Sequence, residues 1–437
     1  MQKNITPRLI PALLAIAFAG GAHASGFALQ NQNGAGTGYA FAGAAAVAED
    51  ASTIYFNPAG MAYLPTGHNF TVAASAIMRS VEFKNNGTTP YLGRPATFPI
   101  GDDGGDGGGT ALVPGLYWSY AINPSLFVGL GISAPYGSET EYDKSFAGRF
   151  SGRYTSIETM NINPSIAYKF NEVVTVGFGL NYASTEVKLK QAAPVFTPVV
   201  IGGVPRLVPT GETEAKIKGD DSTWGWNIGA MFQVTPTTRL GVSYRSKLDH
   251  ELGGDLEVGA TKTNVTADLE TPDNFSLALS QKFGADLEIL ADATWTGWSS
   301  VKQLTAVNDA TGRPAASVLF NYENTWRFGL GGKYQLNPGW NLRAGIAYDQ
   351  SPVPDAESRT MTVPDSDRIW LSVGARWQIN KAASVDFAYA HIFFDDAPVN
   401  RAVPLTLPTG TITAQTVKGD FDVSANILSA QLNYNFQ

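Results

Sequence analysis

The feature that most constrains the fold of this 437-residue chain is an alternation of apolar and polar residues with a period of two. After Asn171, the apolar positions are Val174, Val176, Phe178, Leu180 and Tyr182, and the positions between them are Thr175, Gly177, Gly179 and Asn181. The same alternation recurs near residue 370 and over residues 428–436. Successive side chains of a β-strand point to opposite faces of a sheet, so this pattern predicts half-apolar strands.

The connections between these segments alternate between short turns and long loops. The short turns fall at 122–124, 171–172, 235–236, 284–285, 337–339 and 380–381. The longer polar or Gly/Pro-rich segments are 85–110, 138–152, 192–213, 253–271, 306–317, 353–363 and 400–415. Bacterial outer-membrane barrels have short periplasmic turns and long outer loops. Six turns and seven loops join fourteen strands, which predicts an all-β membrane protein, a 14-stranded antiparallel transmembrane β-barrel.

The asymmetry of the connections disfavours a soluble sandwich or barrel, in which the apolar face would point to a core, and the aromatic residues agree with this. Many of the predicted strands carry tryptophan near one end, at Trp224, Trp226, Trp295, Trp298, Trp326, Trp340, Trp370 and Trp377. Tryptophan gathers at the two membrane–water interfaces of a barrel. The pattern therefore favours a barrel with its apolar face toward lipid, located in the bacterial outer membrane.

The first residues resemble a secretory signal. Lys3 and Arg8 precede an apolar run at 9–20, and Ala22-His23-Ala24 has the small-x-small form of a cleavage site. The alternative, an N-terminal membrane helix, is disfavoured because this run is short for a hydrocarbon core of ~30 Å. We predict a signal peptide at 1–24 and a mature chain that begins at Ser25.

A barrel of fourteen strands is wide enough to leak unless something fills it. Residues 25–66 precede the first predicted strand and are rich in Gly and Ala. Asn57 suits a helix N-cap, Pro58 suits the first helical position, and Ala59 continues the turn. We therefore predict a small helical plug, or hatch, at 25–66 inside a barrel at 67–437; the alternative is a disordered tail.

Charged residues fall on the polar, inward face of several strands. The inward set includes Arg327, Lys333, Arg343, Asp349 and Arg376, together with Arg245, Lys282, Asp292 and Asp386. These residues predict a lumen that is at least partly polar. Their simplest interpretation is that they pair with one another and fill the interior.

Composition excludes several classes of function. The net charge of −8 disfavours a nucleic-acid partner, which would require a basic face. The absence of Cys removes disulfides and thiolate metal sites. His68, His250 and His391 lack metal-ligand spacing, and no Ser/His pair stands in register, so we expect neither an enzyme nor a cofactor.

Several stretches resemble one known family. SGFALQNQNGAGTGYAFAGAAAVAEDASTIYFNPAGMAYL, at residues 25–64, is similar to the N-terminal hatch of the FadL/TodX family of outer-membrane transporters, and GIAYDQSPVPD and PDSDRIWLSVGARW are also similar to family segments. The resemblance implies passive uptake of hydrophobic compounds, above all long-chain fatty acids, by a monomer. It also implies contact with outer-membrane lipid and lipopolysaccharide, and assembly by the barrel-assembly machinery.

The resemblance also implies a path for the ligand. In the family the ligand leaves sideways through a gap at a kink in the third strand, and Pro135-Tyr136-Gly137 stand at that position. Phe27 matches a family phenylalanine that reaches into the internal pocket, and Leu29 lies beside it in the same gate. Within the membrane, main-chain groups freed by such a kink need hydrogen-bond partners from the protein. We expect Asn57–Ala59 to supply these partners.

The chain departs from the family pattern where fatty-acid transporters hold the carboxylate. The position that resembles one basic family residue is Gln191, with Lys188 and Lys190 adjacent, and the segment that corresponds to a second, NYENTW at 321–326, has no Lys. This departure keeps two alternatives open: uptake of uncharged aromatic hydrocarbons by the same route, or a general diffusion porin.

Overall fold

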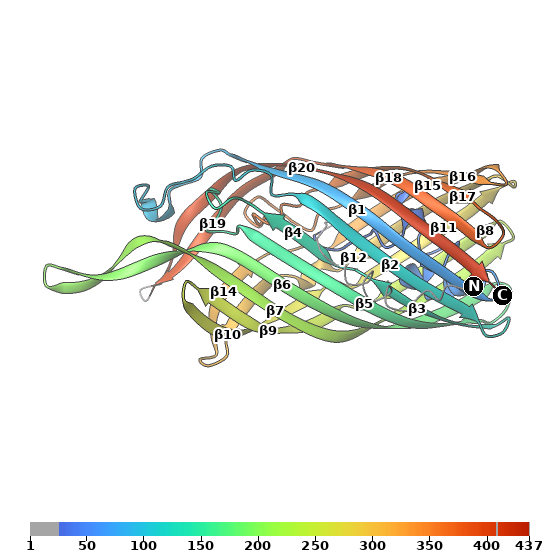
Figure 1. The fold of residues 1–437 in the computed structure, drawn as a ribbon, viewed down its shortest axis with the longest axis horizontal. Coiled ribbons are helices and arrows are strands. Elements are labelled where there is room, and N and C mark those ends of the chain that lie inside the picture. Colours follow the sequence, from blue (N-terminus) through green and yellow to red (C-terminus); the bar gives the residue numbers. More distant parts are fainter. Residues whose placement is uncertain (1–25, 408–409, 437) are drawn as a thin grey trace, which may run out of the picture.

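The computed structural model of the chain describes residues 26–407 and 410–436. The predicted signal peptide at 1–24 lies outside these residues. The strands wind around one axis into a long tube, with the long connections at one end and the tight turns at the other (Figure 1). None of the helices in the described part of the chain is long and apolar enough to cross a membrane.

Fourteen strands form the closed wall. They are β1 (His68–Asn85), β2 (Gly109–Ala121), β3 (Leu126–Ser133), β5 (Tyr154–Lys169), β6 (Val174–Ile201), β7 (Val204–Thr235), β8 (Thr238–Arg245), β11 (Asn274–Phe283), β12 (Leu287–Thr296), β15 (Thr325–Asn337), β16 (Trp340–Asp349), β17 (Arg368–Gln378), β18 (Ala383–Phe394) and β20 (Gly410–Phe436). Each pairs antiparallel with the next. β20 pairs with β1 from His68↔Phe436 to Asn85↔Gly419 and closes the ring. The predicted 14-stranded antiparallel barrel is confirmed.

All six predicted turns join neighbouring wall strands at one end of the tube. Asparagine side chains shape several of these turns. The Asn171 carboxamide oxygen accepts hydrogen bonds from the N–H groups of Val173 and Val174, and Asn380 does the same for Ala382 and Ala383. Asparagine is frequent in turns because its side chain can bond the main chain two residues further on.

The long connections contain six further strands, which were not predicted within the long loops. These strands are β4 (Gly137–Glu141), β9 (Leu248–Val258), β10 (Thr261–Thr271), β13 (Gln303–Asn308), β14 (Arg313–Leu319) and β19 (Ala397–Leu407). β6 and β7 also remain paired out to Ile201↔Val204, through the predicted loop 192–213. The long connections lie where they were predicted, and the Val and Thr residues in them favour the cross-strand pairing.

Large apolar side chains cover the outside of the wall. On β20, Leu428, Leu432 and Tyr434 are each about half exposed. Aromatic pairs lie along the wall, including Tyr182 with Trp224 and Trp340 with Trp377. Trp298 and Trp370, which we expected in the same outer girdles, are instead fully buried against Phe27 and Phe41. They lie inside because Trp370 falls on the inward parity of β17 and Trp298 lies in a connection.

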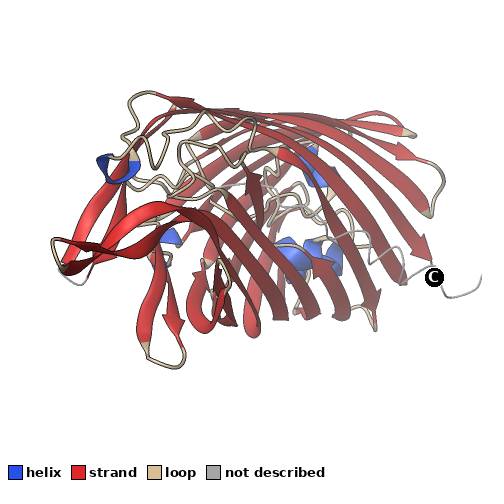
Figure 2. Cartoon of the chain, turned by 60° about the vertical axis from the view of Figure 1, so that its left-hand side comes forward, coloured by secondary structure: helices blue, strands red, loops and turns tan. Residues whose placement is uncertain are grey.

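The N-terminal segment, residues 26–66, lies within the tube (Figure 2). It contains α2 (Gly34–Thr37), α3 (Thr53–Phe56) and the 3₁₀-helix η1 (Pro58–Tyr63). Two more 3₁₀ turns, η2 (Tyr91–Gly93) and η3 (Trp298–Ser300), occur in the long connections. As predicted for a helix N-cap, the Asn57 carboxamide oxygen accepts the N–H of Ala59, and Pro58 opens the turn.

Inward-facing glycines of the wall let the N-terminal segment approach the sheet closely. A Cβ placed on Gly241 of β8 would lie 2.0 Å from the carbonyl oxygen of Ala45, and one on Gly345 of β16 would lie 2.3 Å from the main chain of Tyr39. Any side chain at these positions would occupy the space of the N-terminal main chain. The glycines thus mark where the segment rests on the wall.

We expect Gly241→Val to displace the N-terminal segment, because the added side chain collides with main-chain atoms that cannot rotate away. Overpacking of this kind costs about 1–3 kcal/mol. The measurement is the thermal midpoint of barrel unfolding, and the readout is the heat-dependent mobility of the barrel on a gel. Gly253→Val on β9, where a Cβ meets nothing within 4 Å, is the control and should match the wild type. Equal midpoints for all three proteins would contradict the expected contact.

Candidate functional site

The wall is interrupted between β3 and β4. β3 ends at Ser133, β4 begins at Gly137, and both strands pair with β5. β2 pairs with β3 only over Leu116–Ala121. Among the described residues, no ladder joins the remainder of β2 to β4. The predicted kink at Pro135, Tyr136 and Gly137 is therefore located at a break in the sheet.

Residues 27–29 satisfy the main-chain groups at this break. The N–H of Leu29 donates to the Pro135 carbonyl at 2.8 Å, and the N–H of Gly137 donates to the Phe27 carbonyl at 2.9 Å. The Gln32 carboxamide donates to the Ala134 carbonyl at 2.7 Å. The N-terminal segment thus forms an antiparallel β-bridge, Ala28 with Tyr136, where the wall lacks a strand.

The expectation that Asn57–Ala59 would satisfy the break was wrong. The Asn57 amide group donates instead to the carbonyls of Ala45, Ala230 and Val242, at 2.8, 3.1 and 3.3 Å. These bonds fix the Asn57-Pro58-Ala59 turn to β7 and β8. The partners of the break are residues 27–29, about a hundred residues earlier in the chain, and no local sign of this pairing stands in the sequence.

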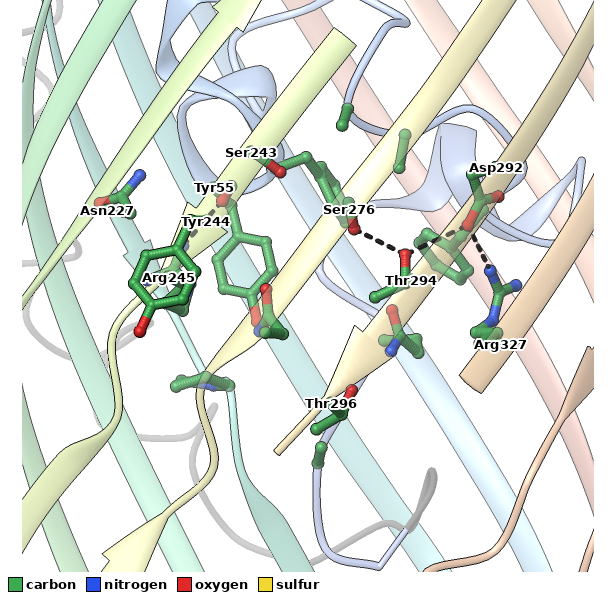
Figure 3. Close-up of a pocket in the computed structure, with 18 of the residues that line it drawn as sticks. Tyr55, Asn227, Ser243, Tyr244, Arg245, Ser276, Asp292, Thr294, Thr296 and Arg327 are labelled. Carbon is green, nitrogen blue, oxygen red and sulfur yellow. Dashed lines mark hydrogen bonds and ion pairs between the residues drawn. The ribbon is translucent and has the colours of Figure 1, made fainter. Parts of the chain in front are cut away.

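Two hollows meet at the same residues. An inner cavity of about 70 Å³ lies between the N-terminal segment and strands β7, β8, β11 and β12 (Figure 3). A cleft of about 340 Å³ lies at the break in the wall, lined by Leu112, Pro114 and Ile157 among others. Leu29 and Tyr136 line both hollows. These two side chains separate the interior of the barrel from the cleft.

Phe27 closes the inner side of the break. Its side chain is 1% exposed, with ring centroids 4.9 Å from Trp298 and 5.9 Å from Tyr136. These rings belong to a buried apolar cluster that also contains Ile157, Ala183, Val187, Leu248, Leu252, Val265, Ala267, Leu269, Val301, Leu304, Ala306, Phe320, Tyr322 and Val353. The cluster runs continuously from the long outer hairpins to the break in the wall.

A small apolar cavity of about 30 Å³ lies within the outer part of this cluster. Leu189 of β6, Ile217 of β7 and Val318 of β14 line it with Val187, Leu252, Val265 and Leu304. The side chains around it are almost wholly hydrocarbon. This lining offers few hydrogen bonds to water and is suited to contact with hydrocarbon.

Arg245 lies on the polar side of the inner cavity and was not selected as a ligand residue from the sequence. Its guanidinium donates to the Asn181 side-chain oxygen at 2.5 Å and to the Tyr55 carbonyl at 2.7 Å, and lies 4.3 Å above the Tyr55 ring. The residue is 8% exposed. Within the described chain it forms no salt bridge. Its inward parity and the absence of an acidic neighbour on β8 are the signals that could have identified it.

The other charged group of the cavity is paired. Arg327 reaches Asp292 at 3.4 Å and donates to the carbonyl of Ala40. Asp292 also accepts the N–H of Gly43 at 3.0 Å. This pair links β12 and β15 to the N-terminal segment and leaves Arg245 as the cation of the cavity that lacks a carboxylate in the described structure.

The predicted lumen charges form a network around one acidic residue of the N-terminal segment. Glu49 forms ion pairs with Arg343 at 3.2 Å, Lys333 at 3.5 Å and Arg376 at 3.6 Å. Arg376 also binds Asp386 at 2.8 Å. Asp349, the remaining predicted charge, lies apart and pairs with Arg368 at 3.1 Å. The charges do pair, but through a segment that the strand pattern did not include.

Lys188 and Lys190 do not face the interior. Val187 and Leu189 of the same strand point inward, so strand alternation places both lysines on the outer face. Lys188 pairs with Glu186, and the Lys190 ammonium lies 4.5 Å from the centroid of the Tyr154 ring. Gln191 has the inward parity. Both lysines were predicted near the ligand because they are adjacent to Gln191, but in a strand with a period of two they lie on the opposite face.

His250 links three strands of the outer region. Its ring contacts the Thr185 hydroxyl at 3.2 Å and the Asp221 carboxylate at 3.2 Å, and Thr185 also bonds Thr159 at 2.9 Å. Burial lowers the pKa of His250, although Asp221 opposes this shift. The Thr185 side chain is buried in the sheet. The arrangement therefore joins β6, β7 and β9.

The fold and this site define a class: a β-barrel whose outside is apolar, whose interior contains a folded N-terminal segment, and whose wall has a lateral break. The family model of the outer membrane protein transport proteins (OMPP1/FadL/TodX) matches residues 15–436. The chain belongs to this family of outer-membrane transport proteins, as its sequence motifs predicted, and its location is the bacterial outer membrane.

Individual relatives agree over nearly the whole length. The chain is 31% identical to putative outer membrane protein NMB0088 of Neisseria meningitidis, over 97% of this chain and 98% of that protein. It is 27% identical to the long-chain fatty acid transport protein of Escherichia coli K12, over 91% and 94%. A crystal structure of a Pseudomonas aeruginosa FadL homologue superposes with a TM-score of 0.85 at 25% identity, covering 94% of this chain and 100% of that one.

We expect Glu49→Ala to loosen the N-terminal segment. The substitution leaves Lys333 and Arg343 buried without one of their anionic partners, and breaking a buried pair costs about 3–5 kcal/mol. The measurement is single-channel conductance in planar bilayers, in which a loosened segment admits ions. Asp422→Ala, which removes an exposed pair with Lys84, is the control and should leave conductance unchanged. Wild-type conductance in the Glu49→Ala variant would show that the network does not hold the segment.

Proposed function

We propose that this protein takes up hydrophobic compounds, above all long-chain fatty acids, by passive diffusion through the barrel with sideways release into the membrane. One observation carries the proposal: Leu29 and Tyr136 line both the inner cavity and the wall cleft. A displacement of residues 27–29 would join the two hollows. The ligand would then pass from an apolar interior to lipid without entering the periplasm.

The physical chemistry of the ligand favours this route. Each methylene that leaves water gains about 0.8 kcal/mol, so a long acyl chain partitions strongly into hydrocarbon. The apolar cluster that contains Phe27 and Trp298 offers such surroundings from the outer hairpins to the break. Release into the membrane is then downhill. No ATP or proton gradient is required.

The gate in this proposal is residues 27–29, and the rest of the N-terminal segment acts as the hatch. Two main-chain hydrogen bonds hold residues 27–29 at the break, each with a net value of about 0.5–1.5 kcal/mol. Burial of Phe27 adds about 1.5–3 kcal/mol. A bound acyl chain can replace the Phe27 contacts. By contrast, the Glu49 network holds the remainder of the segment more firmly.

Arg245 favours a fatty acid over an uncharged aromatic hydrocarbon. A buried guanidinium without a salt bridge gains from a ligand carboxylate, whereas a neutral ligand leaves the charge uncompensated. The named function of the Escherichia coli relative, long-chain fatty acid transport, agrees with this choice. Aromatic hydrocarbons remain the alternative ligand. A general diffusion porin is disfavoured, because the N-terminal segment occupies the lumen.

The proposal includes the surroundings of the barrel. Because β1 and β20 complete the ring within one chain, we propose a monomer that contacts outer-membrane lipid and lipopolysaccharide through its apolar outer face. Phe436, near the end of the last strand, would serve as a recognition residue for the barrel-assembly machinery. These partners follow from the family resemblance.

We expect Gly137→Leu to abolish uptake of a labelled long-chain fatty acid while the barrel still folds. A Cβ at Gly137 lies 2.9 Å from the Leu29 side chain, so a leucine there would fill the junction between cavity and cleft. Gly332→Leu on β15, where a Cβ meets its first neighbour at 3.5 Å, is the matched control and should transport normally. Wild-type uptake by the Gly137→Leu variant would refute lateral release.

We expect Arg245→Met to weaken binding of a fatty acid by roughly 10- to 100-fold. This factor corresponds to the free energy of about 1.5–3 kcal/mol that a hydrogen bond to a charged group contributes. Binding of an aromatic hydrocarbon of similar size should change little. Tryptophan fluorescence titration of the purified barrel measures both affinities, and Arg245→Lys should restore part of the fatty-acid affinity. Equal losses for the two ligands would assign Arg245 a purely structural role.

A further inference from the structure

The tip of the β6–β7 hairpin, residues 194–209, is an exposed apolar surface that transport through the barrel does not explain. Figure 1 shows this ribbon extending beyond the other connections at the outer end of the tube. Val200 is 69% exposed and Leu207 is 64% exposed, and Val195, Val199 and Val204 are also exposed. Contiguous exposed apolar residues mark interaction surfaces more often than they mark inert loops.

Both faces of the hairpin tip are apolar. Val199 and Val200 are adjacent in one strand, so they point to opposite faces, and both are exposed. Arg206 is the only charged residue between Gln191 and Glu212 in the sequence. A two-stranded ribbon has no core in which to bury these side chains. A single arginine, Arg206, is too little charge to bind a charged polymer.

Prolines make the tip a poor site for the addition of another strand. Pro194 and Pro198 lie in β6, and Pro209 lies in β7 opposite Phe196. Proline has no N–H, and in a paired ribbon it is accommodated where its nitrogen faces outward. The prolines therefore interrupt the row of hydrogen-bond donors on each outer edge, and the edges resist pairing with a second copy of the chain.

The inward face of the same hairpin leads to the apolar cavity of the outer cluster. Leu189 and Ile217, farther down β6 and β7, line that cavity. The inward positions between them and the tip are uncharged: Gln191 and Ala193 on β6, opposite Ala215 and Thr213 on β7. A hydrocarbon chain could follow this face from the tip to the cavity without passing a charge.

We propose that the hairpin tip docks on a hydrocarbon–water interface, specifically the surface of a neutral lipid droplet, from which cargo moves along the hairpin into the barrel. The identity of the cargo rests on the proposed function, whereas the docking itself does not. The low charge of the tip, with Arg206 as its single charged residue, the interrupted edges and the continuity with the apolar cavity together select this occupant over a charged polymer or a second copy.

The test compares two doubly substituted full-length barrels held in amphipol. Val200→Asp with Leu207→Asp places two charges on the apolar tip. Thr406→Asp with Thr411→Asp adds the same charge to the neighbouring β19–β20 hairpin, outside the tip, at exposed hydroxyls that bond each other at 3.1 Å. Flotation with triacylglycerol droplets coated with phosphatidylcholine measures docking. We expect the apolar-tip variant to lose at least about tenfold in droplet affinity, and the threonine variant to dock like the wild type.

Wild-type docking by the Val200/Leu207 variant would overturn the proposal, as would an equal loss in both variants, which would indicate a simple charge effect. A tip-dependent dimer in sedimentation experiments would overturn it in favour of a second copy. In cells, the tip variant should lose uptake from droplets but keep uptake of fatty acid delivered by cyclodextrin. Gly137→Leu should dock normally and lose uptake from both sources, so failure of the lateral route and failure of docking are distinguishable.

Discussion

The constraint on which this structure depends is that every main-chain N–H and C=O group in the hydrocarbon layer must have a partner within the protein. Thirteen sequential pairings and the β1–β20 closure meet it around the ring. Within the described wall, the strand pairing is interrupted only where β3 stops at Ser133 and β4 begins at Gly137. There residues 27–29 and the Gln32 side chain supply the missing partners. A break in the membrane-spanning wall therefore requires a segment that covers it and satisfies its main-chain groups.

The N-terminal segment is held by two kinds of contact with different strengths. Its middle rests on wall glycines and is bound through Glu49 to two buried cations, Lys333 and Arg343, and to the partly buried Arg376. Its first described residues are held by two main-chain hydrogen bonds and by the Phe27 ring. This difference gives the segment a fixed body and a more easily released end. The released end is the part that touches both the inner cavity and the cleft.

The regular parts of the fold could be predicted from the sequence because they depend on local patterns. The period of two identified the wall strands, and turn residues such as Asn171 and Asn380 gave the connections and their number. The same local reasoning failed where a residue's role depends on distant partners. Trp298 and Trp370 have the composition of girdle residues, yet their partners are Phe27 and Phe41. Lys188 and Lys190 were assigned by adjacency, although alternation turns them outward.

The sequence by itself determined the class of this protein, because strand alternation and the contrast between turns and loops are written in consecutive residues and leave little but a membrane barrel. The resemblance of its motifs to a known family also indicated an interruption at Pro135–Gly137, where a proline cannot continue a ladder. Only the tertiary structure decided what fills that interruption and which cation faces the cavity. The partners of Pro135 and Gly137 lie more than a hundred residues away in the chain, and the isolation of Arg245 depends on which acidic residues other strands bring near it. Such pairings follow from closure of the ring, which no local pattern encodes.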